Sequence, residues 1–287
     1  LALWRDPNGG RFLLHTGSVD ELLAFRFSFQ DGEPVMAEPI PFLAAGPEMA
    51  ETYFALKLNV VDLDGDGRPE LLADGNPGKI AVMRGGRAGD FREAGCAVMR
   101  GGSLAGETLV SPWRTDLDGD GRPDLLLADA SGFLTFWPGT ADPLVYGAPV
   151  RFTSAGKELH VQAGYSGSIQ GPNEKRWGYL KVTAGDWDGD GRWDILAGSP
   201  NGCNAFIMGR KIPTKATVFF LRNTGSNAAP VFERPVPLAG ADGALLNFGV
   251  HNATPCPTDL DGDGRPDLLV GAEDGKVYYF KRNQLKD

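Results

Sequence analysis

Cysteine and histidine are scarce in this sequence of 287 residues, with three of each. The odd number of cysteines prevents complete pairing within the chain, and a disulfide between Cys203 and Cys256 is the pairing that we consider alongside simple buried thiols. Neither a Cys-x-x-Cys pair nor a Cys/His spacing typical of zinc sites occurs. The sequence therefore offers no zinc centre of a familiar kind.

Long apolar runs are also missing. No run approaches the roughly 18 residues that a membrane-spanning helix needs, so we expect no membrane span. The chain begins at Leu1 without Met and without the regions of a signal peptide, as expected if a leader was removed or the chain was trimmed.

Several catalytic and binding patterns are absent as well. The sequence has no Gly-x-Ser-x-Gly elbow and no phosphate-binding Gly-Lys-Ser/Thr loop. Glu158 and Glu174 are the only acidic pair in the long loop before residue 179, which disfavours a glycosidase. The basic residues are dispersed, so we expect no nucleic-acid partner.

Glycine and proline, in contrast, are abundant, with 40 and 21 residues respectively. This content argues against a helical bundle, whereas 42% hydrophobic and 10% aromatic residues suffice for a buried core. The formal net charge of −9 is uneven, because four short loops hold 16 of the 37 acidic residues. The remaining surface is mildly basic and compatible with an anionic ligand.

These four loops are copies of one nine-residue pattern, Asp-x-Asp-Gly-Asp-Gly-Arg-x-Asp/Glu, which begins at Asp62, Asp116, Asp186 and Asp259. Each copy precedes an apolar run, a turn that contains glycine and a second run rich in β-formers. The copies begin 54, 70 and 73 residues apart, which is long enough for one four-stranded propeller blade each.

Carboxylates at positions 1, 3, 5 and 9 of the pattern suit a hard cation that takes six to eight oxygen ligands, and a carbonyl at position 7 adds a further donor. The loops lack the His and Cys that zinc prefers, and magnesium demands stricter geometry, so we expect about four calcium ions. The expected metal residues are Asp62, Asp64, Asp66, Arg68 and Glu70; Asp116, Asp118, Asp120, Arg122 and Asp124; Asp186, Asp188, Asp190, Arg192 and Asp194; and Asp259, Asp261, Asp263, Arg265 and Asp267.

The first 27 residues form a degenerate fifth copy, in which Trp4 and Asn8 occupy the first and third ligand positions, so we expect no metal there. We therefore predict an all-β fold, a β-propeller of about five blades with four antiparallel strands each, which either closes by itself or belongs to a longer, seven-bladed ring. A single domain, residues 1–287, is divided into approximate units 1–45, 46–103, 104–154, 155–240 and 241–287.

The loops closely resemble those of the FG-GAP or VCBS repeat family, whose calcium-binding blades build the propeller of integrin α subunits and of many secreted bacterial proteins. The resemblance implies the propeller and the calcium. It does not imply one activity, because the family includes adhesive modules, sugar-binding proteins and polysaccharide lyases. Glu70 departs from the usual last Asp, which we expect to weaken the first loop slightly.

Propeller topology places the acidic loops on one face and two insertions on the opposite face. These insertions, residues 156–178 and 200–217, lie where other units use shorter connections, and long loops on a rigid scaffold often hold binding sites. Aromatic, amide and cationic side chains there suit a sugar, including an anionic one. The candidate catalytic residues are His160, His251, Tyr165 and Arg176, and the candidate ligand-binding residues are His15, Gln170, Trp177, Tyr179 and Lys211.

Three functions follow as hypotheses. The first is a calcium-stabilised module that binds carbohydrate on the insertion face. The second is a polysaccharide lyase, with His160 or His251 as the base, a tyrosine as the acid and Arg176 or Lys211 facing a uronate carboxylate. The third is a module for protein adhesion. Whether the protein is an enzyme stays open, and the millimolar calcium outside cells favours a secreted, periplasmic or cell-surface location.

Overall fold

The structure is a computed structural model. It describes residues 2–5, 9–18, 21–31, 33–44, 59–63, 70–75, 79–84, 92–99, 102–103, 110–129, 131–162, 180–199, 205–207, 210–212, 216–249, 252–272 and 274–287, some of them by backbone only. Within these ranges nearly every element is a β-strand, and no helix is long and apolar enough to cross a membrane.

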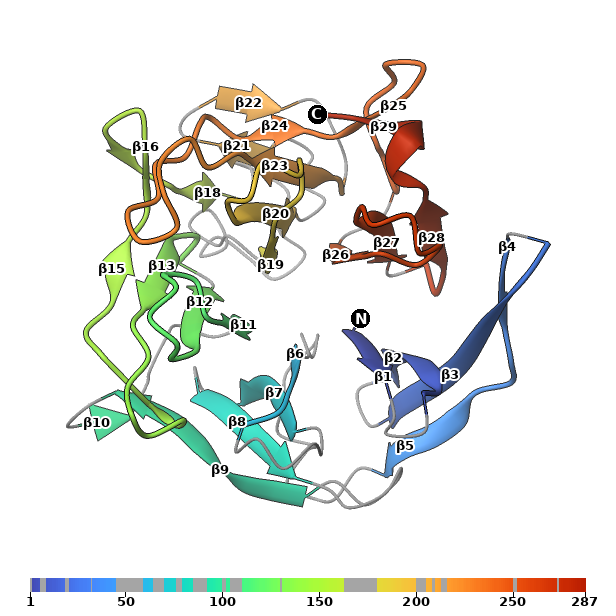
Figure 1. The fold of residues 1–287 in the computed structure, drawn as a ribbon, viewed down its shortest axis with the longest axis horizontal. Helices are drawn as coiled ribbons and strands as arrows, with labels where there is room; N and C mark the ends of the chain where they lie inside the picture. The colour runs from blue at the N-terminus through green and yellow to red at the C-terminus, as the bar shows by residue number, and fades with distance from the viewer. Residues whose placement is uncertain are drawn as a thin grey trace, which may run out of the picture.

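Five sheets surround a common axis, and the first strand of each lies innermost (Figure 1). The chain is thus a β-propeller, as the sequence predicts. With strands given from the axis outward, the first sheet comprises β1 (Ala2–Arg5), β2 (Arg11–Ser18) and β3 (Glu21–Gln30), with β4 (Glu33–Met36) and β5 (Ile40–Ala44) on different halves of β3; the second comprises β6 (Asn59–Val61), β7 (Glu70–Gly75), β8 (Lys79–Arg84), β9 (Arg92–Met99) and β10 (Gly102–Ser103). The third sheet comprises β11 (Ser111–Thr115), β12 (Asp124–Ala128), β13 (Leu134–Trp137) and β15 (Val150–Arg151). The fourth comprises β19 (Lys181–Gly185), β20 (Asp194–Gly198), β23 (Val218–Leu221) and β24 (Val236–Pro237), and the fifth comprises β26 (Ala253–Thr258), β27 (Asp267–Ala272) and β28 (Val277–Phe280).

The second strand of each of the last three sheets is buried along its whole length. Successive side chains of a strand point to opposite faces. Leu125 and Leu127 therefore pack toward the second sheet, while Leu126 packs toward the fourth. A sheet that is covered on both faces needs apolar residues at every position, which explains the Leu-Leu-Leu run.

Close backbone approach is part of the same stacking. A Cβ atom added at Gly198, in β20, would lie 1.8 Å from the Ala253 carbonyl oxygen and 2.7 Å from Pro255 Cδ of the fifth sheet. Only glycine at this position lets β20 and β26 lie so near each other.

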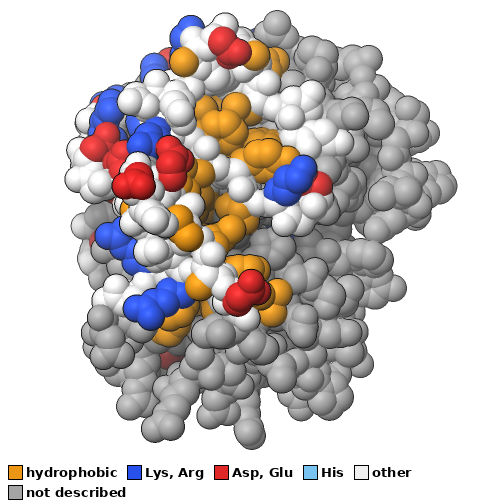
Figure 2. Space-filling view, turned by 90° about the vertical axis from the view of Figure 1, so that its right-hand side faces the viewer, with side chains coloured by type: hydrophobic (Ala, Val, Ile, Leu, Met, Phe, Trp, Pro, Cys, Tyr) orange, Lys and Arg blue, Asp and Glu red, His pale blue; other side chains and the backbone are white. Residues whose placement is uncertain are grey.

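The ring closes where the fifth sheet packs on the first. Leu13 and Phe27 of the first sheet share a core cluster with Leu269 of the fifth, and the Arg11 guanidinium donates a hydrogen bond to the Leu260 carbonyl oxygen at 3.2 Å. Within the described chain, five sheets thus form this ring. The fifth sheet has three described strands rather than the expected four. Its outermost described strand, β28, has side chains that are all partly exposed. This strand lies on the side of the molecule where Figure 2 shows hydrophobic side chains at the surface.

Three short pairings join elements that the repeat pattern keeps separate. β14 (Val145–Tyr146) pairs in parallel with β9 of the second sheet, and β25 (Ala239–Gly240) pairs with β29 (Leu285–Lys286), which follows the 3-10 helix η3 (Arg282–Gln284). In addition, β16 (Thr153–Ser154) pairs with β17 (Lys157–Glu158).

The two insertions meet in space. β18 (Val161–Gln162), at the start of the first insertion, pairs with β21 (Ala205–Ile207) of the second, and β21 continues to β22 (Arg210–Ile212). The structure thus brings both insertions together.

Candidate metal centres

Each fully described acidic loop is a tight turn that joins the first strand of a sheet to the second. The glycines at positions 4 and 6 have φ of 80° and 84° in the second loop (residues 116–124), 80° and 85° in the third (186–194) and 80° and 85° in the fourth (259–267). Non-glycine residues rarely adopt these values. The two glycines therefore determine the backbone shape of the loop, while the aspartates around them supply the carboxylate groups.

The first aspartate of each loop holds the turn together. In the second loop, the Gly119 and Gly121 N–H groups donate to the two carboxylate oxygens of Asp116 at 2.8 and 3.0 Å. The same pair of bonds forms on Asp186 in the third loop and on Asp259 in the fourth. These bonds leave the remaining lone pairs of the carboxylate able to accept a cation.

The last aspartate of each loop is buried at the start of the second strand. Asp124, Asp194 and Asp267 are each at most 1% exposed, and each accepts at least two backbone hydrogen bonds, as Asp194 does from Trp187 at 3.2 Å and Asn223 at 2.8 Å. Burial raises the pKa of Asp194 to about 6; the Asn223 N–H opposes the rise and the nearby Asp188 charge adds to it.

Burial also raises the pKa of Asp124 above its usual range. Burial penalises a charged carboxylate that lacks a counter-ion, so a cation beside Asp124 or Asp194 would offset that cost. The donor set itself, hard carboxylate oxygens without nitrogen or sulfur, also suits a divalent cation such as calcium.

Three carboxylates converge in each of these loops, with ligand oxygens that all lie within 4.8 Å of one another. The groups are compatible with a bound divalent cation. They comprise positions 1, 3 and 9 in the second and third loops and positions 1, 3 and 5 in the fourth: Asp116, Asp118 and Asp124; Asp186, Asp188 and Asp194; Asp259, Asp261 and Asp263.

The arginines at position 7 hold the aspartates at position 5. Arg122 pairs with Asp120, and Arg192 pairs with Asp190, while Arg265 lies 3.3 Å from Asp263. In the fourth loop, Asp267 is held instead by the Tyr279 hydroxyl, which donates at 3.0 Å. The third carboxylate of the converging group is thus position 9 in the second and third loops and position 5 in the fourth. The shared pattern does not predict this difference.

In the first loop, only Asp62 and Glu70 of the expected metal residues are described. Glu70 is buried and accepts the Leu63 N–H at 2.7 Å, the same bond that the last aspartate makes in the other loops. The longer side chain thus fulfils the structural part of that position. Asp64, Asp66 and Arg68 lie outside the described residues.

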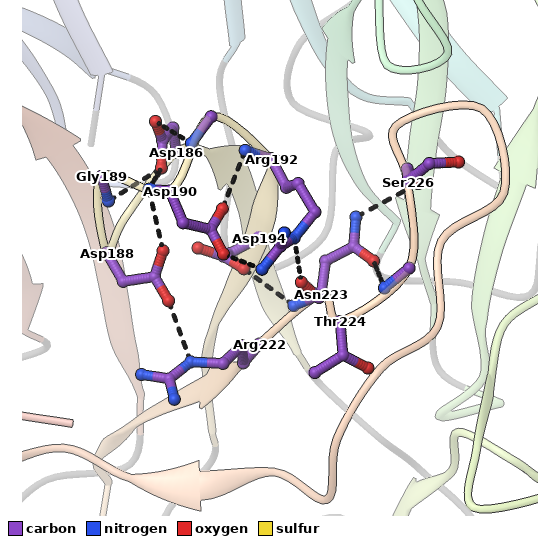
Figure 3. Close-up of polar contacts among 12 residues, drawn as sticks. Asp186, Asp188, Gly189, Asp190, Arg192, Asp194, Arg222, Asn223, Thr224 and Ser226 are labelled. Atoms are coloured by element: carbon purple, nitrogen blue, oxygen red, sulfur yellow. Dashed lines mark hydrogen bonds and ion pairs between the residues drawn. The ribbon is translucent and has the colours of Figure 1, made fainter.

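The third loop has further support that the others lack in the described structure (Figure 3). Its position 8 is Trp193 instead of proline, and the Trp193 N–H donates to Asn227 Oδ1 at 3.1 Å. Arg222, at the end of β23, lies with its Nε 2.9 Å from an oxygen of Asp188. Sequence reasoning missed Asn227 and Arg222, because both come from strands or turns far along the chain.

Among the candidates on the insertion face, the structure describes the side chain of His160. Its ring stacks on Phe133 with centroids 4.4 Å apart, and its Nε2 lies 3.0 Å from the Ser131 carbonyl oxygen. Ser131 belongs to the turn between β12 and β13, at the end opposite the acidic loop, so His160 lies on the expected face. His15 and Lys211 are described by backbone only, in β2 and β22, and the other candidates fall outside the described residues: His251, Tyr165, Arg176, Gln170, Trp177 and Tyr179.

Comparison with known proteins agrees with the geometry of the loops. The model of the FG-GAP-like repeat matches residues 116–197, and that of the FG-GAP repeat matches residues 251–280. Human integrin alpha-IIb is 27% identical over 242 residues, 83% of this chain and 22% of its own length. Integrin alpha-PS2 of Drosophila melanogaster is 28% identical over 256 residues, 80% of this chain and 16% of its own. The chain thus spans only a small part of these relatives.

Proposed function

Because this chain belongs to the FG-GAP repeat family, we propose that it is a calcium-stabilised, adhesion-like binding module whose ligand is a carbohydrate. The observation that supports the proposal most is the convergence of three carboxylates in every acidic loop that is fully described. In this proposal the whole chain is one domain, with calcium on one face and the ligand on the other.

Calcium would be held by the carboxylates of the four acidic loops and the carbonyl at position 7 of each. Millimolar calcium at a Kd of roughly 10 μM would stabilise the fold by about 2.7 kcal/mol per site. Four sites together would contribute about 10 kcal/mol, which is comparable with the net stability of an ordinary domain. A protein that depends on this stabilisation would work where calcium is plentiful, so we propose a secreted, periplasmic or cell-surface location.

The ligand would bind on the insertion face. Pairing between β18 and β21 supports one shared surface there, because it joins the two insertions that contain most of the candidate residues. The contact of His160 with Ser131 limits how His160 could act as a base. A carbonyl can only accept a hydrogen bond, so the contact with Ser131 makes His160 Nε2 the protonated nitrogen. Only Nδ1 of the neutral ring would remain to act as a base.

A polysaccharide lyase is the second candidate, and protein adhesion without sugar recognition is the third, which the similarity to two integrin alpha chains favours. A screen against a glycan panel in calcium, repeated with chelator, tests the first proposal. Incubation with acidic polysaccharides, followed by the absorbance of unsaturated uronate, tests the second.

His160→Ala separates these candidates. A lyase that uses His160 loses turnover, whereas a binding module only loses affinity, and Asp116→Asn on the opposite face serves as a control for general damage. If no glycan is bound or cleaved in calcium, the carbohydrate proposal is wrong and a protein ligand becomes the better explanation. If chelator leaves the melting temperature unchanged, the calcium proposal is wrong.

A further inference from the structure

In one acidic loop, an arginine side chain lies beside an aspartate that is expected to coordinate the metal. In the third loop, Arg222 Nε lies 2.9 Å from an oxygen of Asp188, the aspartate at position 3. The contact is an ion pair without the alignment of a good hydrogen bond. The Asp188 side chain is 13% exposed and that of Arg222 is 39% exposed, so water screens the pair only in part. The positive charge of Arg222 therefore neutralises part of the Asp188 charge that an incoming cation would otherwise bind.

The other described loops lack this arrangement. Strand register places Pro138 at the equivalent position in the third sheet and Lys281 in the fifth, each one residue beyond the last paired residue. Within the described chain, no basic side chain lies within ion-pair distance of Asp118 or Asp261, the aspartates that correspond to Asp188. The third loop thus differs from its neighbours in electrostatics while it shares their backbone.

Arg222 also has a second acid within reach. Its terminal nitrogen lies 4.0 Å from an oxygen of Asp287. The Asp287 carboxylate accepts the Trp187 indole N–H at 2.8 Å and an Arg282 N–H at 2.7 Å, and Trp187 is position 2 of the same loop. A guanidinium displaced from Asp188 can therefore remain paired without a large movement.

We propose that Arg222 is a positioning residue that lowers the cation affinity of the third loop by holding Asp188, and that Asp287 receives its guanidinium when a cation binds. This inference rests on the proposed calcium binding. Its consequence is graded occupancy, in which the third loop fills at a higher calcium concentration than the second.

The size of the effect follows from the charges. A unit charge about 6 Å from a divalent cation would change affinity by about four orders of magnitude at an effective dielectric constant of about 20, and only about tenfold at the dielectric constant of water, about 80. Screening of a side chain that is more than a third exposed reduces the expected change to about tenfold. We therefore expect Arg222→Gln to tighten cation binding at the third loop about tenfold, and Arg222→Lys to stay near the wild type.

Terbium reports on this loop selectively. Trp187 and Trp193 lie within the third loop, and no other acidic loop contains tryptophan, so terbium emission excited through tryptophan arises mainly there. Titration of the intact chain with Tb³⁺, followed by displacement with calcium, gives the affinity of the loop. Asp186→Asn should abolish the signal, and Lys281→Gln, which removes the equivalent charge of the next sheet, should leave the half-saturation unchanged.

The outcomes separate this inference from the proposed function. If the wild type gives no terbium signal that depends on Asp186, cation binding by the loop is refuted and the role of Arg222 falls with it. If binding is seen but Arg222→Gln does not tighten it, or Arg222→Lys tightens it equally, the inference alone is overturned. Pro138→Arg gives the converse test in a chain that keeps Arg222. It should weaken one site in a calorimetric calcium titration, and an unchanged titration contradicts the proposal.

Discussion

Replacement of Gly198 by alanine tests whether the sheets are held by direct backbone contact. The added Cβ would lie 1.8 Å from the Ala253 carbonyl oxygen, and ordinary contact begins near 3.4 Å, so the neighbouring backbone would have to move by more than 1 Å. That oxygen belongs to the innermost strand of the fifth sheet and cannot move alone, because Ala253 pairs with Ala272 of β27.

Overpacking of this kind costs about 3 kcal/mol or more when the clash is with backbone. For a chain of this size, the expected decrease in melting temperature is roughly 6 to 12 °C, measured by circular dichroism in excess calcium. Gly185→Ala is the matched control, because a Cβ there has no atom within 4 Å and the residue ends β19 of the same sheet. If both variants melt together, the close approach of β20 and β26 does not exist in solution.

Three further predictions concern the acidic loops. Asp124→Asn should reduce the calcium stoichiometry by one ion in calorimetric titration, and an unchanged stoichiometry contradicts its role as a ligand. Gly191→Ala should destabilise the chelator-treated protein by about 1 to 2 kcal/mol in urea, because φ is 85° there; no loss of stability would show that the turn relaxes. Trp193→Pro, which introduces the residue of the other loops, should cost about 3 kcal/mol because the ring packs between Phe152 and Phe232. A more stable variant would argue against that packing.

The repeat pattern predicted the fold because it encodes local geometry. Glycines at positions 4 and 6 permit the positive φ that this turn requires, and the apolar run that follows each loop can be covered on both faces only between two other sheets. The degenerate first copy was recognised in the same way, and its strands β1, β2 and β3 pair as the alignment of Leu13 and Leu14 indicates.

The pairs between distant parts of the chain could not be predicted in this way. Arg222 reaches Asp188 because β23 lies beside β20 in a particular register, and a shift by one residue would point the guanidinium to the other face. The role of Tyr279 beside Asp267, and the choice between positions 5 and 9 as the third carboxylate, also depend on side chains that no local pattern specifies.

The short strand β14 has a consequence for fragments of this protein. Val145 and Tyr146 follow the hairpin β12–β13 of the third sheet in sequence, yet they extend the second sheet by pairing with Val98 and Met99. A fragment cut at the repeat boundary would thus lose the parallel strand that pairs with the end of β9. Neighbouring repeats thus contact each other through strand pairing at the outer edge as well as through packing near the axis. We therefore expect unfolding to spread from one repeat to the next instead of stopping at a boundary.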